Sequence, residues 1–424
     1  MSSDFLTELR ARGLAHERSE GLEARLARGP ISGYIGFDAS ARSLHVGHLL
    51  QVFLLVHLQR TGGAPVIVIG GATGMIGDPS GKNSERKLLD DAAIASNAAA
   101  LQAQLERFVD FSPGPAQARM VDNRDWLAGM SVLTYLRDIG KHFTVPYMLA
   151  KDSVQARLGA GMSFTEFSYM TLQAADFLHL HRELGVDLQM GGADQWGNIT
   201  AGLELIRRVE GREEGADASA YGLCSPLLLT RTGVKMGKSE RGAVFLDPTL
   251  TSPYEFHQYW LNDDDLLVIQ HLRWLTLLSV EEIAAIEAEH AARPESRAAH
   301  RALAHDLTAR IHGREEADRQ VKVAAAVFSP DPIEDPDVLD VLFREVSGFA
   351  LVPAAAGGSV ADLVVASALA TSKSEARRAV EQGGVTVNGQ RMALDSSIPA
   401  VLHGRYLVVR LGRKRLAVGR IAPA

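Results

Sequence analysis

The stretch ISGYIGFDASARSLHVGHLLQVFLLVHLQRTGGAPVIVI, residues 31–69, decides the fold. Its first part, Ile31–Phe37, predicts a strand, and an apolar helix is expected from about Leu44 to Arg60. The segment Thr61–Pro65 breaks this helix, and Val66–Ile69 is an uninterrupted apolar strand of the kind that parallel sheets bury. Strand, helix and strand in this order form a βαβ unit. The unit predicts an α/β fold with a doubly wound parallel sheet, whose ligands bind beyond the carboxyl ends of the strands.

The rest of the chain reads as further helices and strands. Its 424 residues are too many for one ordinary core, so two or three domains are expected. Helices are expected over Ser3–Arg28, Ala92–Val109, Val132–Asp138, Phe164–Arg182 and, as a small bundle, Ser252–Asp318, and strands over Val186–Met190 and Pro226–Thr230. The segment SPDPIEDP, residues 329–336, is rich in proline and aspartate and begins a linker region. A compact basic domain is expected from about Gly357.

Composition is that of an ordinary soluble protein. Apolar residues make up 46% and charged residues 22%, and no apolar run approaches the roughly 18 residues of a membrane helix. Met1–Leu14 lacks the pattern of a signal peptide, so a cytoplasmic protein without membrane contact is expected. Cys224 is the only cysteine, which excludes an internal disulfide and a cysteine-rich zinc cluster. We expect it to be a small core residue.

Charge is unevenly distributed along the chain. From Ser359 to the end, ten lysines and arginines stand against four acidic residues, which gives +6, whereas the whole chain carries −7. The remainder therefore carries −13. A basic module on an acidic body suggests a polyanion partner at one end, with a solvated surface as the plainer alternative.

The tetrapeptide His45-Val-Gly-His48 follows the first strand and opens a helix. Helix starts present free amide groups and partial positive charge, so anions bind there. Gly47 allows a ligand to approach the backbone closely, and imidazoles three residues apart share one helix face. Together they predict a site for ATP phosphates. A metal site is the weaker alternative, because no third ligand of plausible spacing is found.

The pentapeptide Lys235-Met-Gly-Lys-Ser239 places two lysines in a loop after a predicted strand. Lysine is a point charge suited to phosphate. Taken alone, an exposed basic loop explains the pentapeptide equally well.

A polar stripe runs along the helix expected at Phe164–Arg182. Tyr169, Gln173 and Asp176 stand at i, i+4 and i+7 among apolar neighbours. A carboxylate is costly to bury unless a donor meets it, and no lysine or arginine lies within one turn of Asp176. A ligand hydroxyl is the candidate donor. The alternative is that Asp176 faces solvent or caps another element.

The segment Gln189-Met-Gly-Gly-Ala-Asp-Gln195 follows a short predicted strand. Gly191 and Gly192 permit the close approach of a flat nucleoside, and Asp194 can accept hydrogen bonds from ribose hydroxyls. A plain turn is the alternative.

The histidine and lysine motifs, in this order and about 190 residues apart, resemble the two signatures of class I aminoacyl-tRNA synthetases. Val46 and Gly237 stand where isoleucine and serine are commonest, and we expect a small effect of each. Further matching segments extend the resemblance to bacterial-type tyrosyl-tRNA synthetases over essentially the whole chain: Tyr34–Asp38, Gly77–Lys82, the polar stripe, and Gly191–Gln195. In the tail, Ser372–Val380 and Gly384–Gly389 resemble an S4-type RNA-binding module.

The resemblance implies roles for the matching residues. The substrate phenol would be held by Tyr34 and Asp176. The α-amino group would be held by Asp78, Tyr169 and Gln173, with Gln195 beside the reacting carboxylate. ATP would be bound by Asp38, His45, Gly47, His48, Gly192, Asp194, Lys235 and Lys238. Catalysis would rest on His45, His48, Lys82, Arg86, Lys235 and Lys238, and RNA binding on Lys373, Arg377 and Arg378.

The implied reaction joins L-tyrosine to tRNA(Tyr) in two steps. The tyrosine carboxylate attacks the α-phosphorus of ATP and pyrophosphate leaves; the 3′-terminal ribose of the tRNA then attacks the mixed anhydride. Because both first reactants are anionic, the site needs positioning and cations rather than a general base. Mg²⁺ would accompany ATP, and neither a permanently bound cofactor nor a metal site of the protein is expected. The resemblance also implies a homodimer, for which the apolar segment Trp126–Tyr147 is a candidate interface.

The expected organisation is a Rossmann-like catalytic domain with a dimer-interface insertion (1–230), a lysine loop with a helical domain (231–327), a linker region (328–356) and a small α+β S4-like RNA-binding domain (357–424). Three rivals stay open. A tryptophan-specific relative shares the scaffold, but the S4-like tail and the Tyr34/Asp176 pair count against it. A different adenylyl-transferring enzyme would not need the tail. A catalytically silent RNA-binding paralogue would have lost active-site lysines or the first histidine.

Overall fold

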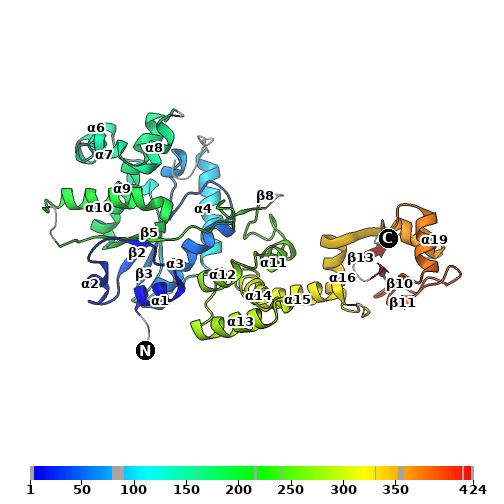
Figure 1. The fold of residues 1–424 in the computed structure, drawn as a ribbon. Helices are drawn as coiled ribbons and strands as arrows, with labels where there is room; N and C mark the ends of the chain where they lie inside the picture. The colour runs from blue at the N-terminus through cyan, green and yellow to red at the C-terminus, as the bar shows by residue number, and fades with distance from the viewer. Residues whose placement is uncertain are drawn as a thin grey trace. The chain divides into compact units, whose positions relative to one another are not determined.

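The computed structural model describes residues 4–78, 90–159, 161–213, 217–239, 242–329, 331–351, 358–412 and 415–421. The chain forms two compact units (Figure 1). The first comprises Met1–Thr251 and Asp263–Leu303, and the second comprises Ser252–Asn262 and Ala304–Ala424.

The first unit is built on a six-stranded sheet with the order β1-β6-β5-β2-β3-β4. Its strands are β1 (Glu17–Arg18), β2 (Ser32–Phe37), β3 (Ala64–Ile69), β4 (Arg119–Asp122), β5 (Leu188–Gly192) and β6 (Tyr221–Ser225). Five are parallel, and β1 pairs antiparallel with β6 at one edge. The chain runs from β2 outward to β4 on one side and later fills β5 and β6 on the other. The predicted doubly wound sheet is thus confirmed, and the strand order reverses between β2 and β5, where such folds bind ligands.

The first unit also contains helices. They are α1 (Phe5–Arg12), α2 (Leu22–Leu26), η1 (Val46–His48), α3 (Leu49–Arg60), η2 (Thr73–Met75), α4 (Asp91–Leu105), α5 (Arg124–Leu127), α6 (Val132–Asp138), η3 (Gly140–His142), α7 (Val145–Leu149), α8 (Asp152–Leu158), α9 (Phe164–Leu184), η4 (Ala193–Gln195), α10 (Trp196–Val209), α12 (Val268–Leu275), α13 (Val280–Ala292) and η5 (Pro294–Ser296). The strands β7 (Lys238–Ser239) and β8 (Gly242–Ala243) form a separate two-stranded ladder. The helix α3 packs on strands β2 and β3 of the six-stranded sheet. Nine residues of α3 are buried, because this helix is apolar on all sides.

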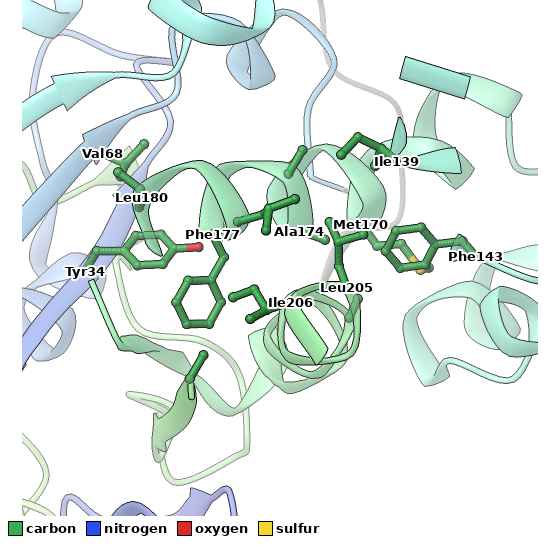
Figure 2. Close-up of a cluster of buried hydrophobic side chains, with 14 of the residues drawn as sticks. Tyr34, Val68, Ile139, Phe143, Met170, Ala174, Phe177, Leu180, Leu205 and Ile206 are labelled. Carbon is green, nitrogen blue, oxygen red and sulfur yellow. The ribbon is translucent and has the colours of Figure 1, made fainter. Parts of the chain in front are cut away.

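The long helix α9 carries the polar stripe and is fixed at both ends. Ser163 and Glu166 form a reciprocal capping box at its start, and Gly185 ends it with a φ of 63°. Its buried side packs with α10 and with Tyr34 of β2 in one apolar cluster, which Figure 2 shows. The Tyr34 and Phe177 rings lie 5.3 Å apart between centroids. The stripe is therefore held against the sheet beside the point where the strand order reverses.

Some sequence-based boundaries were wrong. The helix expected over Ser3–Arg28 breaks into α1, β1 and α2, because Gly13 and Gly21 adopt φ values of 74° and 79°. The last strand of the six-stranded sheet along the chain is β6, not Pro226–Thr230, because a proline has no amide hydrogen for a central ladder. The strand β4 was missed. Cys224, as expected, is a buried core residue of β6.

The second unit joins helices to a five-stranded sheet. Its elements are α11 (Pro253–Leu261), the later part of α14 (Ala298–His312), α15 (Arg314–Phe328), α16 (Pro336–Val341), η6 (Leu342–Ser347), β9 (Gly348–Leu351), α18 (Val360–Ala366), α19 (Lys373–Glu381), β10 (Val385–Val387), β11 (Gln390–Arg391), β12 (Tyr406–Leu411) and β13 (Arg415–Ile421). The sheet order is β11-β10-β12-β13-β9. Part of the segment expected as a linker, Gly348–Leu351, thus pairs with β13 as a strand of this sheet. Among the described helices of the whole chain, none is long and apolar enough to cross a membrane.

Candidate active site

The carboxylate of Asp176 forms the floor of the site at the sheet's strand-order reversal. Its side chain is buried, with 4% of the residue exposed, so the solvent-facing alternative is wrong. Asn123 donates to one oxygen at 3.0 Å, and the Trp126 indole donates to the other at 2.8 Å. Burial raises the pKa of Asp176 to about 7, although these two hydrogen bonds act in the opposite direction.

Asn123 and Trp126 were missed in the sequence. Asn123 follows the unpredicted strand β4 and is itself fixed, since it also donates to Thr73 and accepts from the backbone amide of Ala72. Trp126 stacks on His179 of α9 at a centroid distance of 4.3 Å. The protein therefore supplies two donors to Asp176, where the sequence had suggested only a ligand hydroxyl as the candidate.

The hydroxyl of Tyr34 is buried in the same region and has no hydrogen-bond partner among the described residues. Burial, reinforced by the charge of Asp176, raises the pKa of Tyr34, so the hydroxyl keeps its proton at neutral pH. A buried hydroxyl without a partner is costly. The pair offers a donor and an acceptor to one small polar group of a ligand.

A second polar network lies along the stripe. Gln195 donates to Asp78 at 2.7 Å, and Asn198 donates to Gln173 at 3.2 Å and to Gln195 at 3.1 Å. Tyr169 is buried on the same helix as Gln173. The structure thus brings Asp78, Gln173 and Gln195 together as predicted. It adds Asn198, one turn after Gln195, which no motif in the sequence singled out.

The histidine motif forms a short 3₁₀ helix, η1, before α3. The His45 ring accepts from the amide of Gly47 at 3.1 Å, and the His48 ring accepts from the amide of His45 at 3.1 Å. Their rings are 3.9 Å apart between centroids. We expected the backbone amides at this helix start to be free to bind an anion. Two of them, those of His45 and Gly47, instead donate to the histidine rings of the motif itself.

The two signature motifs touch each other. A Cβ atom at Gly47 would lie 2.7 Å from the carbonyl oxygen of Met236, and one at Gly237 would lie 3.0 Å from His45 Nδ1. Gly237 has a φ of 129°, which favours glycine. The close approach at Gly47 is thus to the second motif, whereas we had expected it to a ligand.

Lys235 of this loop binds Asp194 through a 2.6 Å ion pair. The lysine side chain is 45% exposed and the aspartate 23%. Asp194 follows Gly192, where a Cβ would lie 3.1 Å from the Gln51 amide nitrogen. Asp38, after β2, lies against Gly70, after β3. Lys82 and Arg86 lie outside the described residues, and of Lys238 only the backbone, in β7, is described.

The tail residues belong to the second unit. Lys373, Arg377 and Arg378 are exposed on α19. Lys373 pairs with Asp362 of α18 at 2.6 Å. The helix therefore offers exposed positive charge, with one of its cations already paired.

Comparisons with known proteins agree over both units. The family described as tRNA synthetases class I (W and Y) matches residues 26–329, and the family of tyrosine–tRNA ligase SYY-like C-terminal domains matches residues 340–418. A tyrosine–tRNA ligase of Anaeromyxobacter dehalogenans (strain 2CP-1) is 50% identical and one of Geobacillus stearothermophilus is 43% identical, each alignment covering 99% of this chain and at least 99% of the relative. A C-terminally truncated mitochondrial tyrosyl-tRNA synthetase of Aspergillus nidulans superposes with a TM-score of 0.69 at 29% identity, covering 77% of this chain and 94% of that one.

Proposed function

We propose roles for the residues of this site on one premise: the chain belongs to the class I tRNA synthetases, and within them to the tyrosine–tRNA ligases. It is an aminoacyl-tRNA synthetase that uses ATP to join tyrosine to its tRNA. The full-length match to tyrosine-specific relatives removes the tryptophan-specific, other adenylyl-transferring and catalytically silent rivals.

The tyrosine phenol binds between Tyr34 and Asp176. Its hydroxyl donates to the Asp176 carboxylate and accepts from the Tyr34 hydroxyl. The observation that carries this proposal is the buried Tyr34 hydroxyl, which has no partner among the described residues beside a buried carboxylate. Phenylalanine would leave both groups without this partner, and that penalty is a physical basis for rejecting it.

The other end of the amino acid binds at the second network. Asp78 supplies negative charge for the α-ammonium group, and the amide oxygen of Gln173 and the hydroxyl of Tyr169 accept from the same group. Gln195 already donates to Asp78 and holds it in place. In this arrangement the substrate carboxylate lies next to Gln195, with the ammonium and phenol fixed at separate points.

ATP lies over the carboxyl ends of β2 and β5, with Asp38, Gly47, Gly192 and Asp194 around its nucleoside and His45 and His48 at its phosphates. A carboxylate oxygen of tyrosine attacks the α-phosphorus, and the bond from that phosphorus to the bridging oxygen of pyrophosphate breaks. Lys235 and Lys238, with Lys82 and Arg86, neutralise the charge that builds on pyrophosphate. Lys235 must first leave Asp194, and this exchange favours the transition state over the resting enzyme.

Mg²⁺ enters as part of the MgATP substrate. The carboxylates nearest the nucleotide edge are engaged, Asp194 by Lys235 and Asp78 by Gln195. We therefore assign the ion to the phosphates, and it adds charge neutralisation that the lysines and histidines share.

The tail docks the tRNA. Arg377 and Arg378 on α19 contact phosphates of tRNA(Tyr), and Lys373 joins them by exchanging Asp362 for a phosphate. In the division proposed here, residues 357–424 form the RNA-binding domain, while adenylate formation belongs to the first unit.

The enzyme works as a cytoplasmic homodimer. Large apolar side chains are exposed on α6, α7 and the start of α9, and such patches mark protein interfaces. They are Val132, Leu133, Leu136, Val145 and Phe164, exposed by 72, 79, 50, 59 and 76%. Leu133→Glu is expected to shift sedimentation from dimer to monomer. A monomeric wild-type chain would contradict this assembly.

The test of the whole proposal is ATP–pyrophosphate exchange without tRNA, run separately with each of the twenty amino acids. Exchange with tyrosine alone is expected. Exchange with tryptophan would overturn the roles of Tyr34 and Asp176.

A companion assay tests the tail. Replacing Arg377 and Arg378 together by alanine should lower kcat/KM for tRNA by about tenfold and leave tyrosine-dependent exchange unchanged, because each residue contributes only phosphate contacts. Arg293→Ala, which removes an exposed arginine of the first unit paired with Glu289, is the matched control. Equal loss in both assays would contradict the division of roles.

A further inference from the structure

Three metal-ligand side chains converge in the first unit, in a segment that the aminoacylation chemistry does not use. Asp265 lies in the loop before α12, His290 in the last turn of α13 and His300 in the first turn of α14. One ring nitrogen of each histidine and one carboxylate oxygen of Asp265 lie within 4.8 Å of one another. No spacing in the sequence suggested this group, because three separate segments contribute to it.

The tautomer of His300 can be assigned from its contacts. Its Nε2 lies 3.1 Å from the backbone oxygen of Asp263, and a carbonyl can only accept, so Nε2 carries the proton. The Nδ1 atom then holds a lone pair. It is fully buried and has no donor among the described residues. An imidazole whose other N–H is fixed by a backbone carbonyl is the arrangement in which proteins present histidine to metals.

His290 supplies a second unsatisfied nitrogen. Its Nδ1 is also buried without a partner among the described residues. Its ring meets that of His300 edge to face, with 5.4 Å between centroids. Two buried nitrogens left unsatisfied side by side are rare in native proteins, and a shared cation would satisfy both.

Asp265 completes the group from the solvent side. Its side chain is 73% exposed, and one of its oxygens lies 3.1 Å from His300 Nε2, the protonated side of the ring. To bind an ion at Nδ1 the carboxylate has to rotate away from this N–H, which its exposure allows without disturbing the core. Two imidazoles and one carboxylate, with a water molecule as the fourth ligand, are a ligand set that suits Zn²⁺.

We propose that Asp265, His290 and His300 bind a divalent transition-metal ion, with Zn²⁺ as the best fit. The ion ties the loop before α12 to the ends of α13 and α14. Its role is structural: it raises the stability of this part of the first unit and takes no part in adenylate formation.

The test is titration of the metal-stripped full-length enzyme with Zn²⁺ alone, followed by calorimetry. One equivalent is expected to bind to the wild type. His290→Gln and Asp265→Asn should each weaken this binding by at least about tenfold. Loss of a residue that only hydrogen-bonds to a metal ligand already lowers affinity by about tenfold or more, so loss of a ligand should do no less. Neither change empties a fully buried position, so both variants should fold. His305→Gln is the matched control, because His305 also pairs with an aspartate, Asp318, at 2.8 Å, and Zn²⁺ binding should be unchanged.

A second readout separates this group from other histidines such as His45 and His48. Substituting Co²⁺ should give the visible absorption of a nitrogen- and oxygen-ligated ion in the wild type, and His290→Gln should abolish it. Zn²⁺ should also raise the Tm of the wild type and leave that of Asp265→Asn unchanged. Absence of saturable binding, or one equivalent bound equally by both variants, would overturn the proposal.

Discussion

The floor of the candidate active site, around Asp176, and the edge at which we propose that ATP binds, around Lys235 and Asp194, are built in opposite ways. At the floor, the Asp176 carboxylate is 4% exposed and is held by two protein donors. At the edge, Lys235 and Asp194 form an ion pair whose partners are 45% and 23% exposed. The floor is fixed before substrate arrives, which suits the recognition of one amino acid. At the edge, both partners of the ion pair are accessible to water, which can take the place of either one. This suits the change of partner that we propose for Lys235 in each turnover.

The largest effect is expected at the edge. Lys235→Ala should lower kcat for adenylate formation by about 10²–10³-fold, because one cation that neutralises the charge building on pyrophosphate is lost. The free energy of unfolding should change by less than about 1 kcal/mol, since exposed ion pairs contribute little to stability. Stopped-flow adenylation and thermal unfolding measure the two quantities.

Lys322→Ala serves as the control for this prediction. Lys322 is also an exposed lysine paired with an aspartate, Asp335, in the second unit. Its replacement should leave kcat unchanged. If Lys235→Ala destabilised the fold as much as it slowed the reaction, the contrast between edge and floor would fail.

The next effect is expected at the floor. Asp176→Asn should reduce the preference for tyrosine over phenylalanine in kcat/KM by about 10–100-fold, because a charged acceptor is replaced by an amide whose NH₂ group meets Asn123 or Trp126. Pyrophosphate exchange with both amino acids measures the ratio. Asp187→Asn removes another partly buried carboxylate, paired with Arg25, and should preserve it. Unchanged selectivity in the Asp176 variant would remove this residue from phenol recognition.

The pH dependence of tyrosine use should report the floor directly. With a pKa of about 7, Asp176 is mostly ionised at pH 8 and mostly protonated at pH 6. The phenol needs the ionised acceptor, so kcat/KM for tyrosine should fall by about tenfold between pH 8 and pH 6. The value of kcat/KM falls toward low pH because the raised pKa of Asp176 leaves its carboxyl protonated in the free enzyme. The tyrosine phenol can donate to this carboxyl only after the proton has left. A profile that stays the same in Asp176→Asn would assign the titration to another group.

The smallest effect should come from one donor beneath the carboxylate. Trp126→Phe removes the 2.8 Å hydrogen bond to Asp176 while keeping an aromatic ring on His179. The loss of a hydrogen bond worth about 1 kcal/mol should raise KM for tyrosine by about fivefold and move the pH profile to higher pH. Steady-state kinetics across pH checks both. Phe256→Leu, a core change in the second unit, should not move the profile, whatever it does to stability.

Much of this site could be predicted from sequence because its signals are local. The run of residues 31–69 gave the βαβ unit, the bounds of α6 were predicted correctly, and the stripe of Tyr169, Gln173 and Asp176 followed from helical spacing. Contacts between distant segments could not be predicted. Asn123 and Trp126 lie beside a four-residue strand too short to show a pattern, and the pairing of Lys235 with Asp194 depends on how a loop folds back.

The contact between Gly47 and the Met236 carbonyl has a consequence for how such a chain can vary over generations. Any side chain at Gly47 displaces the second motif, and any side chain at Gly237 presses on His45. In this chain, a larger residue at either glycine is therefore accommodated only if the other motif shifts. Although 190 residues separate His45 from Lys235, we expect the glycine positions of the two motifs to vary together among related sequences.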